Sequence, residues 1–361
     1  MSKLKLGILG GGLNSVTGYT HFVASQMDGK FKVVSGVFSR HKDINEKTAK
    51  YWSIKRYYNN LEDFIKNEKG KLDAVSVLLP TPYHYEVVKK LLENGFYVIC
   101  EKPLFSTYEE IINFEKFYNP KKHYLVVTYN YIAYPMLGYL KKIIKEGYLG
   151  NILHVHLEMP QESFLRPPKH INYPPAWRKK DGKIPGILLD LASHLGSIFF
   201  YLTGNFITEV KEVLGAKYSK FNVYDDIKVL AKSDDINIFL WVSKVSLGNR
   251  NGLKISIFGD KASAIWIQEK PEFLYINKDN GEKIKIDRSY EDGYFKNRIF
   301  NRMTPGHPSG FIEAFANLYS TIYEDIIYFK KHKKHINNDL IWTFEKEKKN
   351  LKILDKISSK L

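Results

Sequence analysis

Short apolar segments alternate with helical segments through the first 127 residues, and this alternation limits the possible folds more than any other feature. The apolar runs are 6–9, 33–38, 74–79, 97–100 and 124–127, and the helical patterns between them are 20–26, 61–67, 85–94 and 108–118. Strands joined by helices pair in parallel through right-handed crossovers. The pattern therefore predicts an α/β domain, residues 1–127, with a doubly wound parallel sheet that binds ligands at the carboxyl ends of its strands.

The pattern changes after residue 128. Helical periodicity is present at 135–146 and at 188–202, where Gly204 provides the stop. Strand-like segments surround these helices, at 152–159, 206–214, 227–233, 236–246, 253–258, 264–268 and 283–286. Their alternation and short turns predict an α+β domain over 128–361, with a large, open, mostly antiparallel sheet that helices cover on one face.

Composition narrows the classes of partner. Lysine and arginine outnumber acidic residues 55 to 39, a formal charge of +16, but the lysines are spread along the chain, so we expect no nucleic-acid partner. The charge would favour encounters with anionic substrates. One cysteine, Cys100, excludes an internal disulfide. No apolar stretch approaches the roughly 18 residues of a spanning helix, so we expect a cytoplasmic protein with no membrane association.

A glycine-rich loop follows the first apolar run. Gly10, Gly12 and Ser15 have the G-x-G-x-x-small spacing between a strand and a helix. Glycines let backbone amides, here including those of Leu13 and Asn14, approach a pyrophosphate, and a helix start favours negative charge. The motif predicts a dinucleotide site, although three adjacent glycines also suit a flexible turn.

The end of the second apolar run bears on the choice of cofactor. A site selective for NAD usually has an acidic residue here for the ribose hydroxyl, whereas this chain has Ser39 and Arg40. A guanidinium suits the additional phosphate of NADP. We therefore expect NAD or NADP with a preference for NADP, unless Arg40 stacks on adenine or faces solvent.

The third and fourth apolar runs end in a second group of candidates. Leu79, Pro80, Thr81 and His84 follow the third run, and Glu101 and Lys102 follow the fourth. These ends should share one sheet edge with the glycine loop, so Lys102 could donate a hydrogen bond to a reacting oxygen. Pro103 restricts the backbone of Lys102. A surface lysine paired with Glu101 is the alternative.

Asp190 and His194 lie four residues apart in an apolar helical pattern. Such residues share one face of an α-helix. The imidazole could accept the proton of a hydroxyl that loses hydride, and the carboxylate could hold a neighbouring hydroxyl or orient the ring. A buried core histidine next to Asp190 is the alternative. We expect no metal, because the chain has neither an HExxH motif nor a carboxylate cluster.

Together these motifs resemble one protein family. The glycine loop, "LPTPYH" at 79–84, "EKP" at 101–103 and "DLASH" at 190–194 are similar to the family of glucose-fructose oxidoreductase, inositol 2-dehydrogenase and the rhizopine catabolism protein, Gfo/Idh/MocA. The resemblance extends along the whole chain and includes "TYNYIAYPM" at 128–136. It implies a Rossmann domain followed by a domain whose open sheet mediates homodimers or homotetramers.

The resemblance also implies an activity. It is hydride transfer between a nicotinamide cofactor and a secondary alcohol or ketone of a sugar, an inositol-like cyclitol or a sugar derivative, with Lys102, Asp190 and His194 as the catalytic residues. Further candidates for substrate contacts are Asn130, Tyr131, Trp177, Arg178 and His307. Asn130 is also a candidate for cofactor contacts. The segment before Asp190, 183–189, departs from the family's glycine-rich pattern. A sensor that binds the same ligands without turnover is the alternative function.

Overall fold

The computed structural model describes residues 3–168, 174–290 and 293–361, and of Ala176 and Trp177 it describes the backbone alone. The chain divides into two compact units. Unit 1 comprises Met1–Asn130 and Phe311–Lys348, and unit 2 comprises Tyr131–Gly310 and Lys349–Leu361. Each unit has its own sheet.

The sheet of unit 1 is parallel except at one edge. Within the described residues its strands have the order β15-β6-β5-β4-β1-β2-β3. The parallel strands are β1 (Leu4–Gly10), β2 (Phe31–Val37), β3 (Arg56–Tyr57), β4 (Ala74–Leu78), β5 (Val98–Glu101) and β6 (Leu125–Thr128). The fully buried run Ala74–Leu78 is typical of a central strand covered on both faces. The predicted doubly wound sheet is confirmed.

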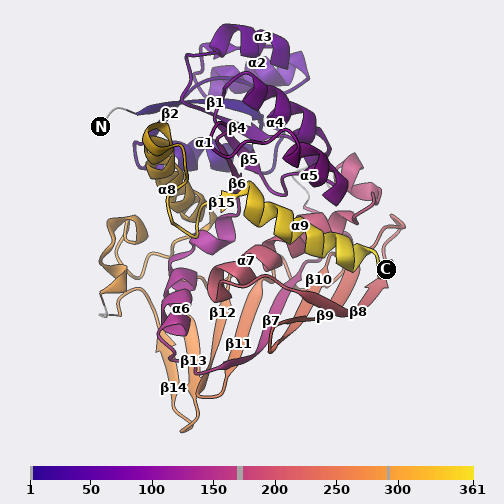
Figure 1. The fold of residues 1–361 in the computed structure, drawn as a ribbon, viewed down its shortest axis with the longest axis vertical. Helices are drawn as coiled ribbons and strands as arrows, with labels where there is room; N and C mark the ends of the chain where they lie inside the picture. Colours follow the sequence, from indigo (N-terminus) through magenta and orange to yellow (C-terminus); the bar gives the residue numbers. More distant parts are fainter. Residues whose placement is uncertain (1–2, 169–173, 291–292) are drawn as a thin grey trace. The chain divides into compact units, whose positions relative to one another are not determined.

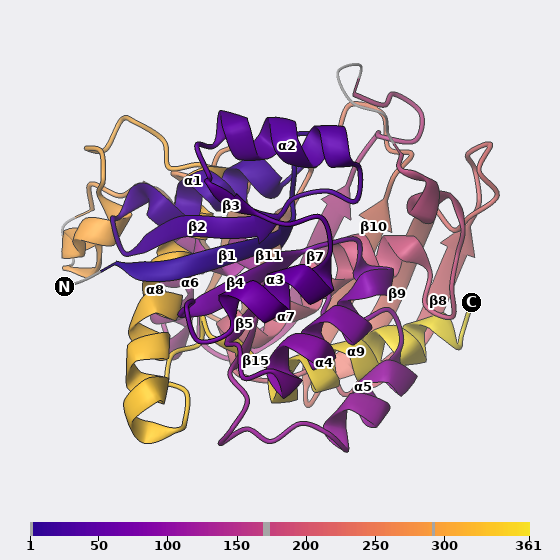
Figure 2. The ribbon, with the colours of Figure 1, turned by 90° about the horizontal axis from the view of Figure 1, so that it is seen from above.

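Helices lie on both faces of this sheet (Figure 2). α1 (Gly18–Met27) and α2 (Lys42–Tyr51) lie on one side, and α3 (Leu61–Glu68), α4 (His84–Glu93) and α5 (Tyr108–Glu115) lie on the other. Local sequence sets where some of them begin. Asn60 caps α3, and Thr107 and Glu110 form a capping box at α5.

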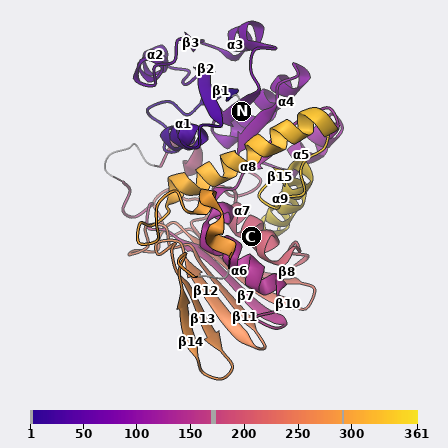
Figure 3. The same ribbon diagram turned by 90° about the vertical axis from the view of Figure 1, so that its left-hand side faces the viewer.

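A distant part of the chain completes unit 1, and it was not part of the predicted first domain. α8 (Phe311–His332) packs beside α1 (Figures 1 and 3), and β15 (Trp342–Thr343) pairs antiparallel with β6. Phe315, Tyr319 and Trp342 are buried there. This segment therefore covers apolar surface of the first sheet, although its sequence is contiguous with the second domain.

Unit 2 is built on a larger sheet. Its described strands have the order β14-β13-β12-β11-β7-β10-β9-β8, and all neighbours are antiparallel except β10 and β7. Their bounds are β7 (Ile152–Pro160), β8 (Glu209–Ala216), β9 (Asp226–Ser233), β10 (Ile236–Ser243), β11 (Lys254–Gly259), β12 (Ala262–Ile267), β13 (Leu274–Lys278) and β14 (Lys283–Ile286). The predicted mostly antiparallel sheet is confirmed, and β13 was missed.

Helices cover one face of this sheet. α6 (Pro135–Lys145) packs on β12, and α7 (Ser193–Thr203), which ends at Gly204 in the left-handed conformation, packs on β7 and on α6. α9 (Phe344–Ser358) reaches α7, where the side-chain amide of Asn350 donates to the carbonyl of Ser193. No helix among the described residues has the length and apolar character needed to cross a membrane.

Candidate functional site

The glycine loop follows β1 with a backbone that favours glycine. Gly10 and Gly11 have φ of +83° and +69°. A Cβ at Gly10 would lie 2.6 Å from the carbonyl oxygen of Leu78, and one at Gly12 would lie 2.8 Å from that of Phe38. Glycine is therefore required here by the packing of the loop against β4 and the end of β2, before any ligand is considered.

The loop and the start of α1 leave backbone donors for an anion. The amides of Gly12 and Leu13 donate within the chain, to Phe38 and to Thr48. Ser15 accepts from the amide of Gly18, where α1 begins. Thr17 makes no side-chain capping bond. The first-turn amides of α1 that follow Gly18 and the amide of the exposed loop residue Asn14 remain the candidates for binding a pyrophosphate.

Ser39 and Arg40 follow β2. The carbonyl of Phe38, just before them, accepts from the amide of Gly12 in the glycine loop. The hydroxyl of Ser39 accepts from the amide of His41. Arg40 is exposed, and the described residues offer its guanidinium neither an ion pair nor a hydrogen bond. A phosphate could therefore bind Arg40 without breaking an existing contact.

His84 lies inside the unit and joins the ends of two strands. Its ring is fully buried, with Nε2 2.7 Å from the carbonyl oxygen of Leu79 and Nδ1 3.0 and 3.1 Å from those of Pro103 and Leu104. Burial lowers the pKa of His84, while the three carbonyls oppose that shift. The ring therefore holds the segment after β4 against the segment that contains Lys102.

The side chains around His84 differ in exposure. Leu79 and Pro80 are half-buried, Thr81 is buried, and Lys102, which follows β5, is half-buried. Glu101 accepts from Thr128 and contacts His21. Burial would raise the pKa of Glu101, but these hydrogen bonds and the charges of His21 and Lys102 lower it. Glu101 is therefore a carboxylate at neutral pH.

Asn130 ends unit 1 on the short helix η2 (Asn130–Ala133). Its side chain is 2% exposed, and its Nδ2 is buried without a hydrogen-bond partner among the described residues. A buried amide donor without a partner is costly. It is the kind of group that a bound ligand satisfies.

In unit 2, Asp190 lies on a π-helical turn. Leu188–Ala192 forms this turn, and the amide of Ser193 donates to the carbonyl of Leu188, five residues earlier. The sequence predicted an α-helix here, with Asp190 and His194 on one face. A π-turn has more residues per turn, so the α-helical spacing does not apply at Asp190. Such turns are frequent at functional sites.

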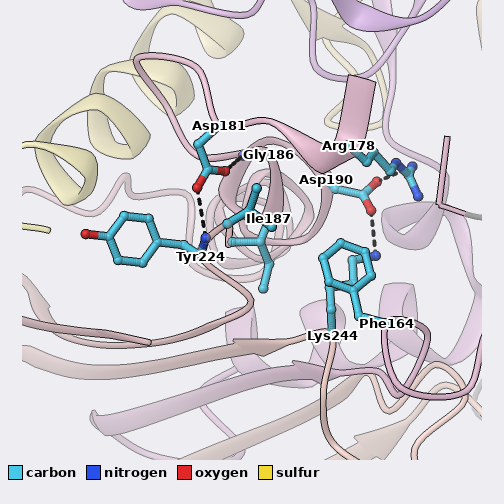
Figure 4. A pocket seen from close by; sticks show the side chains of 9 residues that line it. Phe164, Arg178, Asp181, Gly186, Ile187, Asp190, Tyr224 and Lys244 are labelled. Atoms are coloured by element: carbon cyan, nitrogen blue, oxygen red, sulfur yellow. Dashed lines mark hydrogen bonds and ion pairs between the residues drawn. The ribbon is translucent and has the colours of Figure 1, made fainter. Parts of the chain in front are cut away.

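Two cations hold the carboxylate of Asp190 (Figure 4). Nη2 of Arg178 lies 2.9 Å from Oδ1, and Nζ of Lys244 lies 2.7 Å from Oδ2. These residues line a pocket together with Asp181, Tyr224 and Phe164, among others. Lys244, just after β10, was missed by sequence reasoning. The signal was present, because Lys244 continues the alternation that buries Ile238, Leu240 and Val242.

His194 lies on α7 and contacts Tyr131. Its side chain is 5% exposed, and the two ring centroids are 4.7 Å apart in an edge-on arrangement. The hydroxyl of Tyr131 accepts from the side-chain amide of Asn251. Two of the predicted site residues, His194 and Tyr131, therefore meet in one buried cluster.

The remaining candidates have other surroundings. The backbone of Trp177 belongs to η3 (Ala176–Lys179), which carries Arg178, but its side chain lies outside the described part of the structure. His307 is exposed on a loop, where its carbonyl accepts from Arg288 and its ring approaches Thr304. Its described contacts are thus separate from those of Asp190 and His194.

Comparison with known proteins gives relatives along the whole chain. An uncharacterized oxidoreductase of Bacillus subtilis, YfiI, is 28% identical over 94% of this chain and 89% of its own length. The scyllo-inositol 2-dehydrogenase (NADP(+)) IolW of the same organism is also 28% identical, over 56% of this chain and 53% of its own. The crystal structure of an inositol dehydrogenase homolog from Azotobacter vinelandii, complexed with NADH and myo-inositol, matches with a TM-score of 0.86. At 22% identity it covers 99% of this chain and 95% of its own.

Two family models match adjoining parts of the chain. Residues 4–129 match the model of an oxidoreductase family with an NAD-binding Rossmann fold, and residues 138–265 match the C-terminal domain of GFO/IDH/MocA proteins. The first range contains the glycine loop and Lys102, and the second contains Asp190, His194 and Lys244. The chain therefore belongs to the GFO/IDH/MocA family of NAD-binding oxidoreductases.

Proposed function

We propose that the protein is a dehydrogenase that transfers hydride between a nicotinamide cofactor and a secondary alcohol or ketone of a sugar, cyclitol or sugar derivative. The observation that carries this proposal is a pair of polar side chains in the family's C-terminal domain, Asp190, which is 10% exposed, and His194, which is buried. A carboxylate, Asp190, is held by two cations, and a buried imidazole, His194, follows it four residues later in the chain. The bound nicotinamide would supply the hydride chemistry.

Each residue of the chain would then have one task. In the oxidative direction, the imidazole of His194 accepts the proton of the substrate hydroxyl. The ammonium of Lys102 donates a hydrogen bond to the same oxygen. The carboxylate of Asp190 accepts a hydrogen bond from a neighbouring hydroxyl. Tyr131, Trp177, Arg178 and His307 would contribute to substrate binding.

We also propose how the cofactor binds. Its pyrophosphate would lie at the loop of Gly10, Gly12, Leu13, Asn14 and Ser15. Residues near the strand ends and the partnerless amide of Asn130 would surround the rest of the cofactor: Leu79, Pro80, Thr81, His84, Glu101 and Lys102. Exposed Arg40, with Ser39, supports a preference for NADP over NAD.

The names of the relatives support a polyol substrate. One is an NADP-dependent scyllo-inositol 2-dehydrogenase, and a structural neighbour was solved with myo-inositol. These are properties of those proteins, and for this chain the substrate is a proposal. Location in the cytoplasm is also a proposal, which the single buried thiol of Cys100 supports.

We propose in addition that the protein forms a homodimer or homotetramer through the open face of the unit 2 sheet. Side chains opposite the helix-covered face are half-exposed and partly aromatic. Phe239 and Trp241 on β10 lie opposite Leu230 and Lys228 on β9. Exposed apolar surface of this kind is typical of interfaces. Light scattering of the purified chain tests this.

A substrate screen tests the proposed reaction. The purified protein is incubated with inositols, aldoses, sugar acids and nucleotide sugars, each with NAD or with NADP, and reduction is followed at the nicotinamide absorbance. The proposal expects turnover of at least one polyol. Tight binding of cofactor and sugar without turnover across the screen would favour a ligand sensor.

A further inference from the structure

The carboxylate of Asp190 is bound more completely than its proposed role alone requires. Each of its two oxygens has its own cation, Arg178 at 2.9 Å and Lys244 at 2.7 Å. The side chain of Lys244 is 3% exposed, and that of Arg178 is 22% exposed. A buried lysine is costly unless it is paired and hydrogen-bonded. Its position therefore indicates a specific task.

The sheet fixes Lys244 in place. Ser243 pairs with Pro160 across the parallel strands β10 and β7, so the next residues, Lys244 and Gln161, are also neighbours. Nζ of Lys244 donates to Oε1 of Gln161 at 2.7 Å, and its backbone amide donates to the carbonyl of Asp225. The π-helical turn that carries Asp190 packs against β10. The ammonium is therefore held by the sheet and presented to Asp190.

The other charged groups near Asp190 are occupied elsewhere. The two oxygens of Asp181 accept from the amides of Gly186 and Tyr224, and those of Asp225 accept from Tyr218 and Ser219. The phenol of Tyr224 donates to the carbonyl of Leu361. His194 follows on α7. With two cations on one carboxylate, Asp190 should remain ionised across the range in which the enzyme works.

We propose that Lys244 is a positioning residue that, with Arg178, keeps Asp190 as a fixed ionised acceptor for a substrate hydroxyl next to the reacting carbon. This inference rests on the proposed function. It assigns proton acceptance to His194 alone, because a carboxylate held by two cations is a weak base. It also specifies the substrate class, since the acceptor selects polyols with a hydroxyl beside the carbon that is oxidised.

Carbon NMR of protein labelled at the aspartate carboxyl carbons tests the inference, with Asp190→Asn assigning the signal. In the native chain, the Asp190 signal should remain that of a carboxylate down to a pH below the ordinary aspartate pKa of about 3.9. In Lys244→Met, the pH at the midpoint of the Asp190 titration should rise by about 1 to 3 units, because an opposite charge has been removed. Lys244→Arg should restore the native midpoint.

The matched control is Lys228→Met. Lys228 lies on β9 of the same sheet and pairs with Asp226, which is not part of the pocket lining. Its loss should leave the Asp190 midpoint unchanged. Equal midpoints in Lys244→Met and Lys228→Met would overturn the inference. If Lys244→Met does not fold, Arg178→Met, at the more exposed cation, should raise the midpoint by a smaller amount, and an unchanged midpoint there would be equally decisive against it.

Kinetics give a second, independent reading. On a polyol found in the screen, Lys244→Met should lower kcat/KM and move the acid limb of its pH profile to higher pH. An analogue of that polyol without the hydroxyl next to the reacting carbon should be turned over equally by the native protein and by Lys244→Met. An equal loss on both substrates would indicate a purely structural lysine. If the native chain turns over no polyol, the proposed function fails, while the NMR comparison still decides the role of Lys244.

Discussion

Nε2 of His21 lies 3.0 Å from Oε1 of Glu101, and this contact joins α1, the helix after the glycine loop, to the residue before Lys102. The other ring nitrogen of His21 lies 2.9 Å from the hydroxyl of Tyr319, which in turn lies 3.0 Å from that of Ser76. His21, Tyr319 and Ser76 are buried. A polar chain within unit 1 thus links the helix after the proposed phosphate loop to β5, the strand that ends at Glu101, just before Lys102.

Replacing His21 with alanine should destabilise the protein at neutral pH and make its stability fall less steeply in acid. Glu101 has a lowered pKa in the folded state, so it contributes stability above its ordinary pKa of 4.5, and this contribution is lost as pH falls through the lowered value. Without His21, the pKa of Glu101 should be lowered less, so this contribution is smaller and the difference from the native chain should narrow as pH falls. The free energy of unfolding at neutral pH should fall by about 1.5–3 kcal/mol.

Urea unfolding at neutral pH and in steps down to about pH 4 measures both effects. His21→Gln, which retains a donor, should recover part of the loss. His154→Ala, which removes an exposed imidazole, is the matched control. An acid profile of His21→Ala that coincides with that of His154→Ala would show that His21 has no influence on Glu101.

Arg40→Ala should change the preference between cofactors. If the exposed guanidinium binds the additional phosphate of NADP, its loss should weaken NADP binding by about 1–3 kcal/mol and leave NAD binding nearly unchanged. Fluorescence titration of both cofactors measures this. Arg56→Ala provides a control, because Arg56 pairs with buried Glu68 and should affect stability more than the choice of cofactor. Equal losses for NAD and NADP would indicate that Arg40 stacks on adenine.

His84→Ala should lower both stability and turnover. The substitution removes the ring whose two nitrogens contact the carbonyls of Leu79, Pro103 and Leu104, which should cost about 1–3 kcal/mol of unfolding free energy. It also releases the segment that carries Lys102, so kcat should fall while KM changes little. The comparison is His123→Ala, a buried histidine before β6 that should lose stability alone. Equal kcat values in the two variants would argue against a link from His84 to Lys102.

Local sequence signals predicted most of the elements but not every connection between them. The strands of unit 1 and the glycine stop of α7 follow from apolar runs and turn residues, which act over a few positions. The return of Phe311–Lys348 to unit 1 depends on contacts such as Tyr319 with His21, nearly 300 residues apart in sequence. No local pattern carries such a pairing.

The candidate site shows the same division. Asp190 and His194 stand out as polar residues in an apolar helical pattern, so their types could be predicted. The π-helical turn at Asp190 could not, because its hydrogen bonds depend on packing against β10. Lys244 could have been found by counting alternate residues along β10. Its pairing with Asp190 comes from tertiary structure, since 54 residues separate the two.

The central proposal is that Lys102 and His194 serve one hydride-transfer reaction. The most direct measurement is kcat with a substrate from the screen, for the native chain, Lys102→Ala, His194→Ala and the double variant, all shown to be folded and to bind the cofactor. Each single substitution should lower kcat by about 10²- to 10⁴-fold, and the double variant should lose much less than the product of the two. Turnover near the native rate in either single variant, or fully multiplicative losses in the double variant, would contradict the account.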